Sequence, residues 1–285
     1  MDRYLVIGNP IAHSLSPIIH RAFAEQTKEV LTYERLCVEP ENFFKELDDF
    51  FRAGGKGANI TAPFKGMAYQ YTQGRCSKNA QITQAVNTLY LNPEDGQIWG
   101  ETTDGVGLLR DLRNHQQSVT SKKILILGAG GTTRSILPAL FSENPESITV
   151  YNRTQEKIEA LMGLFSSLGS LKNLTSNQPL STLHGYDLVF NTIPSLASTE
   201  SFFSTLGLDK LLLRGHKTYF HDVNYQKETP FLEYIQSIGA THMSDGLGML
   251  IEQAAESFFI WRGVRPSTSH LSTHLRQSSS NANNI

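Results

Sequence analysis

The chain has 285 residues, with 25 Lys and Arg against 27 Asp and Glu and a formal net charge of −2. This length is typical of two domains rather than one small module. Hydrophobic residues make up 39% of the chain, which is enough to form sizeable buried cores. Without a polybasic block, neither nucleic acid nor an anionic membrane is an expected partner. Cys37 and Cys76 are too few for a disulfide framework and lack zinc-ligand spacing, which fits a reducing cytoplasm.

The amino-terminal segment predicts neither export nor a membrane span. Its apolar run from Tyr4 to Gly8 stops at Asn9-Pro10, short of the about 7 to 15 apolar residues of a signal-peptide core. No other stretch approaches the roughly 18 uninterrupted apolar residues that a membrane helix needs. We therefore expect a cytoplasmic protein.

In the first hundred residues, short apolar runs alternate with segments of helical length, the pattern of an α/β fold. Strands are expected at 3–8, 32–38 and 57–61, and helices at 17–26, 41–52 and 63–71. Pro17 and Pro63 support two of the helix starts, because the first-turn N–H that proline lacks would be unbonded anyway. Residues 87–101 predict two strands around a turn, and Thr103 is expected to cap a helix that runs to Asn114.

A second α/β series follows a polar linker at about residue 115. Strands are expected at 123–127, 148–153, 187–192 and 217–223, and helices at 132–142, 155–164, 230–238 and 246–261. The strands are short and apolar, as buried parallel strands are. The final residues are polar and predict a disordered tail.

The strongest local signal for a ligand is Gly128-Ala129-Gly130-Gly131, between an expected strand and an expected helix. Glycines let the backbone turn tightly and approach a pyrophosphate, whose charge the free N–H groups of the helix start attract. Thr133 stands where the GxGxxG pattern has its third glycine. A purely structural turn is therefore the alternative.

The end of the next strand favours NADP over NAD. An NAD-binding fold usually places an acidic residue there for the ribose 2′-hydroxyl, whereas this strand ends in Asn152-Arg153-Thr154. Arg153 would pair with a 2′-phosphate, and Lys157 and Arg134 would add positive charge. A solvated arginine is the alternative interpretation.

Polar residues gather on the expected loops of the first half, where binding sites collect in open α/β sheets. They are Ser14, Ser16, Asn59, Thr61, Lys65, Asn87 and Asp104. Any one of them alone would more often cap a helix or a turn. The nine histidines show no HxxxH or HExxH spacing, so no metal is predicted.

Seven motifs occur in the order found in shikimate dehydrogenases and span nearly the whole chain. They are GNPIAHSLSPIIH, GANITAPFK, AVNTL, TTDGVGLL, ILGAGG, YNRT and DGLGMLIEQAA. The sequence closely resembles that family. The resemblance implies an oxidoreductase that uses NADPH to reduce 3-dehydroshikimate reversibly to shikimate, a step of chorismate and aromatic amino acid biosynthesis.

The resemblance also implies roles for individual residues. Lys65 and Asp104 correspond to the catalytic pair, and a lysine beside a carboxylate suits the reaction because it can protonate the oxygen of a carbonyl that receives hydride. The substrate-binding positions are Ser14, Ser16, Asn59, Thr61, Asn87, Tyr225 and Gln253, of which Ser14, Ser16 and Tyr225 would hold the carboxylate. The cofactor-binding positions are Gly128, Ala129, Gly130, Gly131, Thr132, Asn152, Arg153, Thr154, Lys157, Gly246 and Met249.

These positions predict an α/β protein of two domains. A discontinuous substrate-binding catalytic domain with a mixed sheet is expected over 1–103 and 245–276, and a Rossmann-like NADP-binding domain over 104–244. A disordered tail is expected over 277–285. The resemblance implies a monomer or a homodimer with a small-molecule substrate.

The chain departs from the family pattern at several places, and its loop 225–230 is slightly shorter than in some relatives. Gly100-Glu101-Thr102-Thr103-Asp104 stands where GDNTD is common, Thr132 replaces an alanine, and Asn191-Thr192-Ile193-Pro194 replaces an NATS-like segment. Two alternatives stay open. One is a quinate/shikimate dehydrogenase with relaxed use of substrate or of NAD, and the other is a non-catalytic nucleotide-binding regulator, against which the presence of Lys65 and Asp104 argues.

Overall fold

The computed structural model describes residues 1–174, 185–194, 203, 206, 208, 217–225 and 229–282. The chain divides into two compact units, here called the first unit (Met1–Leu108 with Ile251–Ile285) and the second unit (Leu109–Leu250). It passes from one to the other within helices α5 (Asp104–Asn114) and α11 (Leu247–Arg262). The predicted domain limits lie at or just before the amino ends of these two helices.

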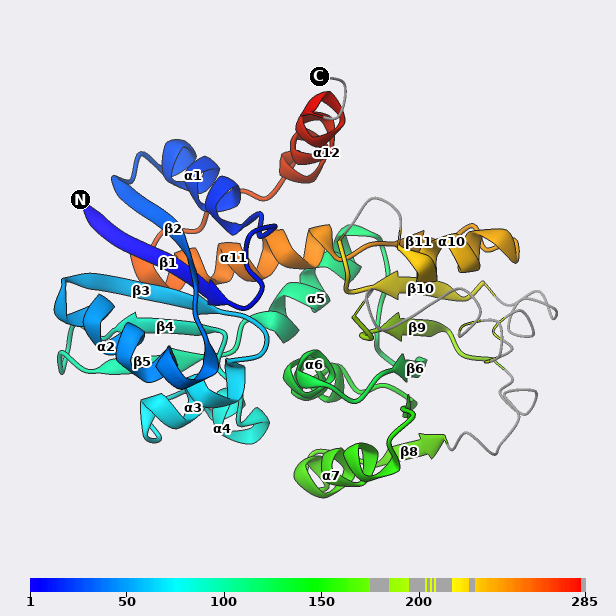
Figure 1. Ribbon diagram of the computed structural model, residues 1–285. Coiled ribbons are helices and arrows are strands. Elements are labelled where there is room, and N and C mark those ends of the chain that lie inside the picture. The colour runs from blue at the N-terminus through cyan, green and yellow to red at the C-terminus, as the bar shows by residue number, and fades with distance from the viewer. Residues whose placement is uncertain are drawn as a thin grey trace. The chain divides into compact units, whose positions relative to one another are not determined.

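The first unit is built on a mixed sheet with the strand order β2-β1-β3-β4-β5. Its strands are β1 (Asp2–Gly8), β2 (Leu31–Cys37), β3 (Gly55–Ile60), β4 (Thr88–Leu91) and β5 (Ile98–Glu101). β1 is parallel to β2 and β3, whereas β4 is antiparallel to both β3 and β5. Strands β4 and β5 form the predicted hairpin. The parallel and antiparallel pairs together confirm the mixed topology of the sheet (Figure 1).

Helices cover this sheet and bury an apolar core against it. They are α1 (Ser16–Thr27), the 3-10 helix η1 (Pro40–Asn42), α2 (Phe43–Arg52), α3 (Lys65–Thr72) and α4 (Lys78–Thr83), together with the carboxyl-terminal part of α11. Helix α12 (Leu271–Ala282) also belongs to this unit. In α2, Phe43, Leu47 and Phe50 recur at the spacing of one helix face and are buried, while the charged residues face solvent. They pack with Ile7 and Ile60 of the strands.

The second unit is a doubly wound parallel sheet with the order β11-β10-β9-β6-β7-β8. Its elements are β6 (Lys123–Leu127), α6 (Gly131–Ser142), β7 (Ser147–Tyr151), α7 (Gln155–Phe165), β8 (Leu171–Leu174), β9 (Leu188–Asn191), β10 (Tyr219–Asp222), α10 (Pro230–Ser237) and β11 (Met243–Ser244). The four strands predicted here are present, and β6, β7, β9 and β10 are largely buried, as expected for parallel strands covered on both faces.

Four of the described elements were not predicted from the sequence. The short helix α4 depends on Ser77, whose side chain accepts a hydrogen bond from the Ala80 N–H, and β8 and β11 are only four and two residues long. The prediction of a disordered tail from 277 is wrong as far as the described residues go, since α12 continues to Ala282. Leu275, which is buried, supplies the apolar contact that the polar composition concealed.

Within the described residues, no helix is long and apolar enough to cross a membrane. Cys37 is exposed and Cys76 is buried, and both are free thiols.

Candidate active site

The central feature of the first unit is an ion pair between Lys65 and Asp104. Lys65 Nζ lies 2.6 Å from Asp104 Oδ2, and the two side chains are 16% and 7% exposed. Lys65 is the first residue of α3, where the positive end of the helix dipole disfavours a cation, so the carboxylate offsets an unfavourable placement. Asp104 begins α5, where the dipole favours its negative charge. The two helix starts thus bring the predicted pair together.

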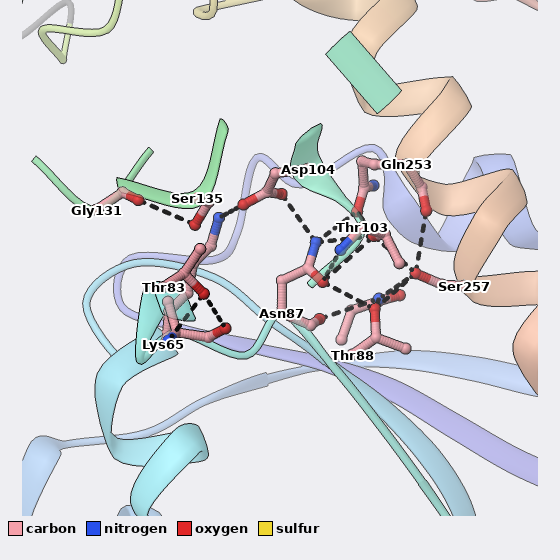
Figure 2. A network of polar contacts seen from close by, with 12 residues as sticks. Lys65, Thr83, Asn87, Thr88, Thr103, Asp104, Gly131, Ser135, Gln253 and Ser257 are labelled. Atoms are coloured by element: carbon pink, nitrogen blue, oxygen red, sulfur yellow. Dashed lines mark hydrogen bonds and ion pairs between the residues drawn. The ribbon is translucent and has the colours of Figure 1, made fainter. Parts of the chain in front are cut away.

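Asn87 fixes the other side of the Asp104 carboxylate. Its Nδ2 donates to Asp104 Oδ1 at 2.8 Å and to Gln253 Oε1 at 3.2 Å, and its Oδ1 accepts from the Thr103 N–H at 2.9 Å. Figure 2 shows Asn87 between Asp104 and Gln253. Four predicted site residues from α3, the start of β4, α5 and α11 therefore form one hydrogen-bonded group.

Asn59 joins this group through residues that the motifs did not single out. Its Nδ2 donates to Ser257 Oγ at 3.0 Å and to Thr88 Oγ1 at 3.2 Å, and Thr88 Oγ1 lies 3.0 Å from Asn87 Oδ1. Ser257 stands four residues after Gln253 on α11, which is one helical turn. That spacing was the available signal, because both side chains lie on one face of the helix.

The predicted carboxylate-binding serines form a tight turn of their own. Ser14 Oγ and Ser16 Oγ are 3.1 Å apart, and the Ser16 N–H donates to Ser14 Oγ at 3.3 Å. Both residues are buried. The guanidinium of Arg35 on β2 donates to the Ser14 carbonyl oxygen from Nε at 3.0 Å and from Nη2 at 2.6 Å. Arg35 is a further residue that the sequence motifs did not identify.

Tyr33, two residues before Arg35 on β2, reaches Asn59. Its hydroxyl donates to Asn59 Oδ1 at 2.7 Å, and its ring stacks on the His20 imidazole with 4.2 Å between centroids. His20 is fully buried, and burial lowers its pKa to about 3. The imidazole is therefore neutral at physiological pH and acts as an aromatic packing surface. Thr61, the remaining predicted residue of this unit, follows β3 directly and is half-buried.

Glu101 and Thr102, where the chain departs from the family pattern, make local contacts of their own. Glu101 accepts hydrogen bonds from the Ser77 hydroxyl and, at 2.8 Å, from the Thr102 N–H, and burial raises the pKa of its carboxyl. The Thr102 hydroxyl oxygen is buried without a hydrogen-bond partner among the described residues.

In the second unit, the glycine loop joins the end of β6 to the start of α6. Gly128 has φ +108, and a Cβ there would lie 2.4 Å from Thr192 Oγ1, so this position requires glycine. Gly130 and Gly131 have open space where a Cβ would stand, at the first residues of α6. Ala129 precedes these two glycines and Thr132 follows them. The first N–H groups of a helix such as α6 have no partner within the helix and can bind an anion.

Thr133, at the position of the third glycine of the GxGxxG pattern, bonds to the loop itself. Its hydroxyl donates to the Gly128 carbonyl at 2.9 Å and lies 2.8 Å from Thr192 Oγ1. Thr192 Oγ1 also donates to the Leu127 carbonyl at 2.9 Å. The hydroxyls of Thr133 and Thr192 connect the start of α6 to the ends of β6 and β9. Thr192, which belongs to the departure from the NATS-like segment, thus has a structural role at the strand ends.

The loop after β7 carries a cation and no carboxylate. Arg153 and Lys157 are exposed, and Asn152 Nδ2 donates to the Thr154 carbonyl at 2.9 Å, which holds the loop before α7. Together with the uncrowded glycine loop, an exposed arginine at this strand end fits a dinucleotide that bears a 2′-phosphate.

Tyr225 and Gly246 lie near a buried carboxylate at the end of β10. Asp222 accepts hydrogen bonds from Asn191 Nδ2 (3.0 Å), Asn224 Nδ2 (2.7 Å) and Thr229 Oγ1 (2.6 Å), and burial raises its pKa. These bonds fix the backbone on both sides of Tyr225, which is half-buried and belongs to the second unit, unlike the other predicted substrate-binding residues.

Gly246 has a packing role that the sequence did not indicate. A Cβ on Gly246 would lie 2.1 Å from the Val223 carbonyl oxygen, so only glycine allows the start of α11 to approach the end of β10. Met249, one turn further on, is buried. Among the described residues, no group of three or more His, Cys, Asp or Glu side chains is placed to hold a metal ion.

Three family descriptions match successive parts of the chain. Residues 6–89 match the shikimate dehydrogenase substrate binding domain, residues 111–214 match shikimate / quinate 5-dehydrogenase, and residues 246–270 match the shikimate 5'-dehydrogenase C-terminal domain.

Curated relatives match over almost their full length. A protein of Alkalilimnicola ehrlichii named shikimate dehydrogenase (NADP(+)) is 44% identical over 279 residues, which cover 96% of this chain and 98% of the relative. One of Saccharophagus degradans with the same name is 40% identical over 279 residues, covering 98% of this chain and 100% of the relative.

Solved structures share the fold. The Ael1 enzyme from Pseudomonas putida has a TM-score of 0.84 and 36% identity, covering 96% of this chain and 98% of that chain. Shikimate 5-dehydrogenase from Thermus thermophilus, solved with NADP(H) and shikimate, has a TM-score of 0.79 and 28% identity, covering 97% of this chain and 99% of that chain.

Proposed function

Because this chain belongs to the shikimate dehydrogenase family, we propose that it catalyses the NADPH-dependent, reversible reduction of 3-dehydroshikimate to shikimate. The observation that carries the proposal is the ion pair of Lys65 and Asp104, buried inside a network of neutral amide and hydroxyl groups. NADPH, when bound, supplies the hydride to the carbonyl carbon of the substrate. All other steps belong to side chains of this protein.

Lys65 is the general acid and base. Hydride addition leaves negative charge on the carbonyl oxygen, and an ammonium group within hydrogen-bond reach stabilises that charge and donates a proton. Asp104, at 2.6 Å, keeps the ammonium oriented, and Asn87 in turn holds the carboxylate. In the reverse direction, Lys65 accepts the proton of the substrate hydroxyl.

The neutral groups around the pair recognise the substrate. Asn59, Thr61, Asn87 and Gln253 offer amides and a hydroxyl that can donate to or accept from ring hydroxyls, while Ser14, Ser16 and Tyr225 hold the carboxylate. A site built from such groups rejects analogues that lack a hydroxyl, since its own polar atoms would be left unpaired. The cofactor is assigned to the glycine loop 128–132 with Asn152, Arg153, Thr154 and Lys157, and to Gly246 and Met249.

The test is the absorbance of reduced nicotinamide with shikimate plus NADP, then with NAD, then with quinate. Reduction of NADP by shikimate is expected, and Lys65→Ala is expected to abolish it. Equal rates with quinate or NAD would overturn the narrow assignment in favour of a broader quinate/shikimate enzyme. No turnover with any pair would overturn the enzymatic proposal.

A further inference from the structure

We propose that Arg35 is a positioning and specificity residue that supplies the positive charge for the substrate carboxylate, at the serine turn that it holds in place. This inference rests on the proposed function, because it concerns the carboxylate of shikimate. It concerns a residue outside all seven sequence motifs.

Side chains alternate between the two faces of the sheet along β2. Tyr33 and Arg35 are two residues apart, so both point to the same face of the sheet, whereas Glu34 points to the other. Tyr33 on that face reaches Asn59, and Arg35 reaches the turn of Ser14 and Ser16. Strand β2 therefore contacts both the network around Asn59 and the turn formed by Ser14 and Ser16.

The guanidinium of Arg35 grips the serine turn through one carbonyl oxygen. Nε and Nη2 both donate to a single main-chain oxygen, that of Ser14, at 3.0 and 2.6 Å. A planar guanidinium makes this fork, which a lysine ammonium cannot reproduce. The two hydrogen bonds fix the carbonyl of Ser14, whose side-chain Oγ lies 3.1 Å from Ser16 Oγ. They therefore also fix the positions of the Ser14 and Ser16 hydroxyls.

The charges of the proposed substrate-binding residues sum to zero without Arg35. Ser14, Ser16, Asn59, Thr61, Asn87 and Gln253 are neutral, and Lys65 is neutralised by Asp104 at 2.6 Å. The proposed substrate-binding residues of the first unit thus have no net charge, although the substrate is an anion. Arg35 adds one positive charge at the serine turn, where both of its hydrogen bonds go to a neutral carbonyl oxygen rather than to a carboxylate.

The test compares Arg35→Met, which removes the charge, with Arg35→Lys, which keeps the charge and loses the fork. At saturating NADP, Arg35→Met is expected to raise the KM for shikimate about tenfold, which is about 1.4 kcal/mol, with kcat and the KM for NADP within about twofold. Arg35→Lys is expected to raise it about threefold. In the unmodified protein the KM for shikimate should increase from low to high salt, because salt screens the charge of Arg35. In Arg35→Met this increase should be nearly absent.

Lys56→Met is the matched control. Lys56 is also an exposed cation of the same sheet, but it lies at the opposite end, beside Gly55, which pairs with Arg3, whereas Arg35 pairs with Val6. The KM of Lys56→Met for shikimate should equal that of the unmodified protein. A KM change below twofold in Arg35→Met, or equal KM values for Arg35→Met and Arg35→Lys with unchanged salt dependence, would overturn the proposal.

Shikimate binding is measured in parallel by calorimetry on the same proteins. If the unmodified protein binds shikimate but does not turn it over, the proposed reaction fails while the binding constants still test Arg35. If it binds no shikimate at all, both proposals fail.

Discussion

Asn87 Nδ2 lies 2.8 Å from Asp104 Oδ1, on the side of the carboxylate opposite to Lys65. Both carboxylate oxygens are therefore engaged, one by an amide and one by an ammonium group. Because Asn87 is itself fixed by the Thr103 N–H, the orientation of Lys65 is determined by a chain of buried contacts.

The first prediction concerns this contact. Asn87→Asp places a second carboxylate beside Asp104 in a buried site, and like charges at this distance hold one of the two protonated. We expect kcat to fall about 10- to 100-fold, with the rise of activity with pH moved to higher pH. Ser257→Ala is the control, since it perturbs the network at Asn59 and Thr88 but does not touch Asp104. An unchanged pH profile in Asn87→Asp would contradict the expectation.

The second prediction concerns the choice of cofactor. Arg153→Ala removes an exposed cation from the loop after β7, so the KM for NADP should rise about tenfold, the lower end for a charge-assisted contact. The KM for NAD, which has no 2′-phosphate, should change little. Lys157→Ala, one turn further on, should have a smaller effect. Steady-state kinetics with both cofactors measure this, and an equal loss with NAD and NADP would show that Arg153 does not bind the 2′-phosphate.

The third prediction concerns a glycine of α11 in the second unit. A Cβ on Gly248 would lie 1.8 Å from Oδ1 of Asp111, whose side chain is buried. Gly248→Ala should lower the free energy of unfolding by about 1–3 kcal/mol, the usual cost of overpacking. Gly163→Ala in α7 is the matched control, because its Cβ would meet open space. It should be neutral or stabilising by up to about 1 kcal/mol. Urea unfolding compares the two, and similar midpoints would refute the steric argument.

The fourth prediction concerns the fully buried His221, whose pKa burial lowers to about 4. Ser244 Oγ lies 2.8 Å and Asp111 Oδ2 3.9 Å from His221 Nδ1, and the charges of Asp245 and His115 act on it in opposite directions. Between pH 6.5 and 4 the unfolded chain takes up a proton at this residue that the folded protein excludes. The contribution of His221 to stability is therefore complete above pH 6.5 and is lost as the pH falls towards 4.

His221→Asn keeps a polar atom near Nδ1 but does not titrate. The difference in unfolding free energy between the unmodified protein and His221→Asn should shrink as the pH is lowered from about 7.5 to about 4.5, by up to about 1.4 kcal/mol per pH unit. His20, which is buried and has a lowered pKa too, is present in both proteins, so its effect cancels. Parallel stability curves over this range would rule out the assignment.

Much of the fold followed from the sequence because its signals are local. Alternating apolar runs and helical segments placed the five strands of the first sheet and β6, β7, β9 and β10 of the second to within a few residues, since burial on a strand or a helix face imposes a fixed period. The segments that this reasoning missed have short or polar sequences, such as α4, which depends on the Ser77 cap, and α12, where Leu275 provides the buried contact. Their stability comes from tertiary packing, which leaves little periodicity to detect.

The sequence by itself determined the residue types of the site: a lysine and an aspartate at two expected helix starts, serines and amides on loops, and an arginine where a dinucleotide site would otherwise have an acid. Only the tertiary structure decided which of them touch. Lys65, Asn87, Asp104 and Gln253 meet because the starts of α3, β4 and α5 lie beside one face of α11, and Ser257 stands on that same face one turn later. Tyr33 reaches Asn59, and Arg35 reaches the Ser14 carbonyl, because strand alternation places both side chains on one face of β2. Such contacts depend on how elements distant in sequence pack together, a relation that no local pattern encodes.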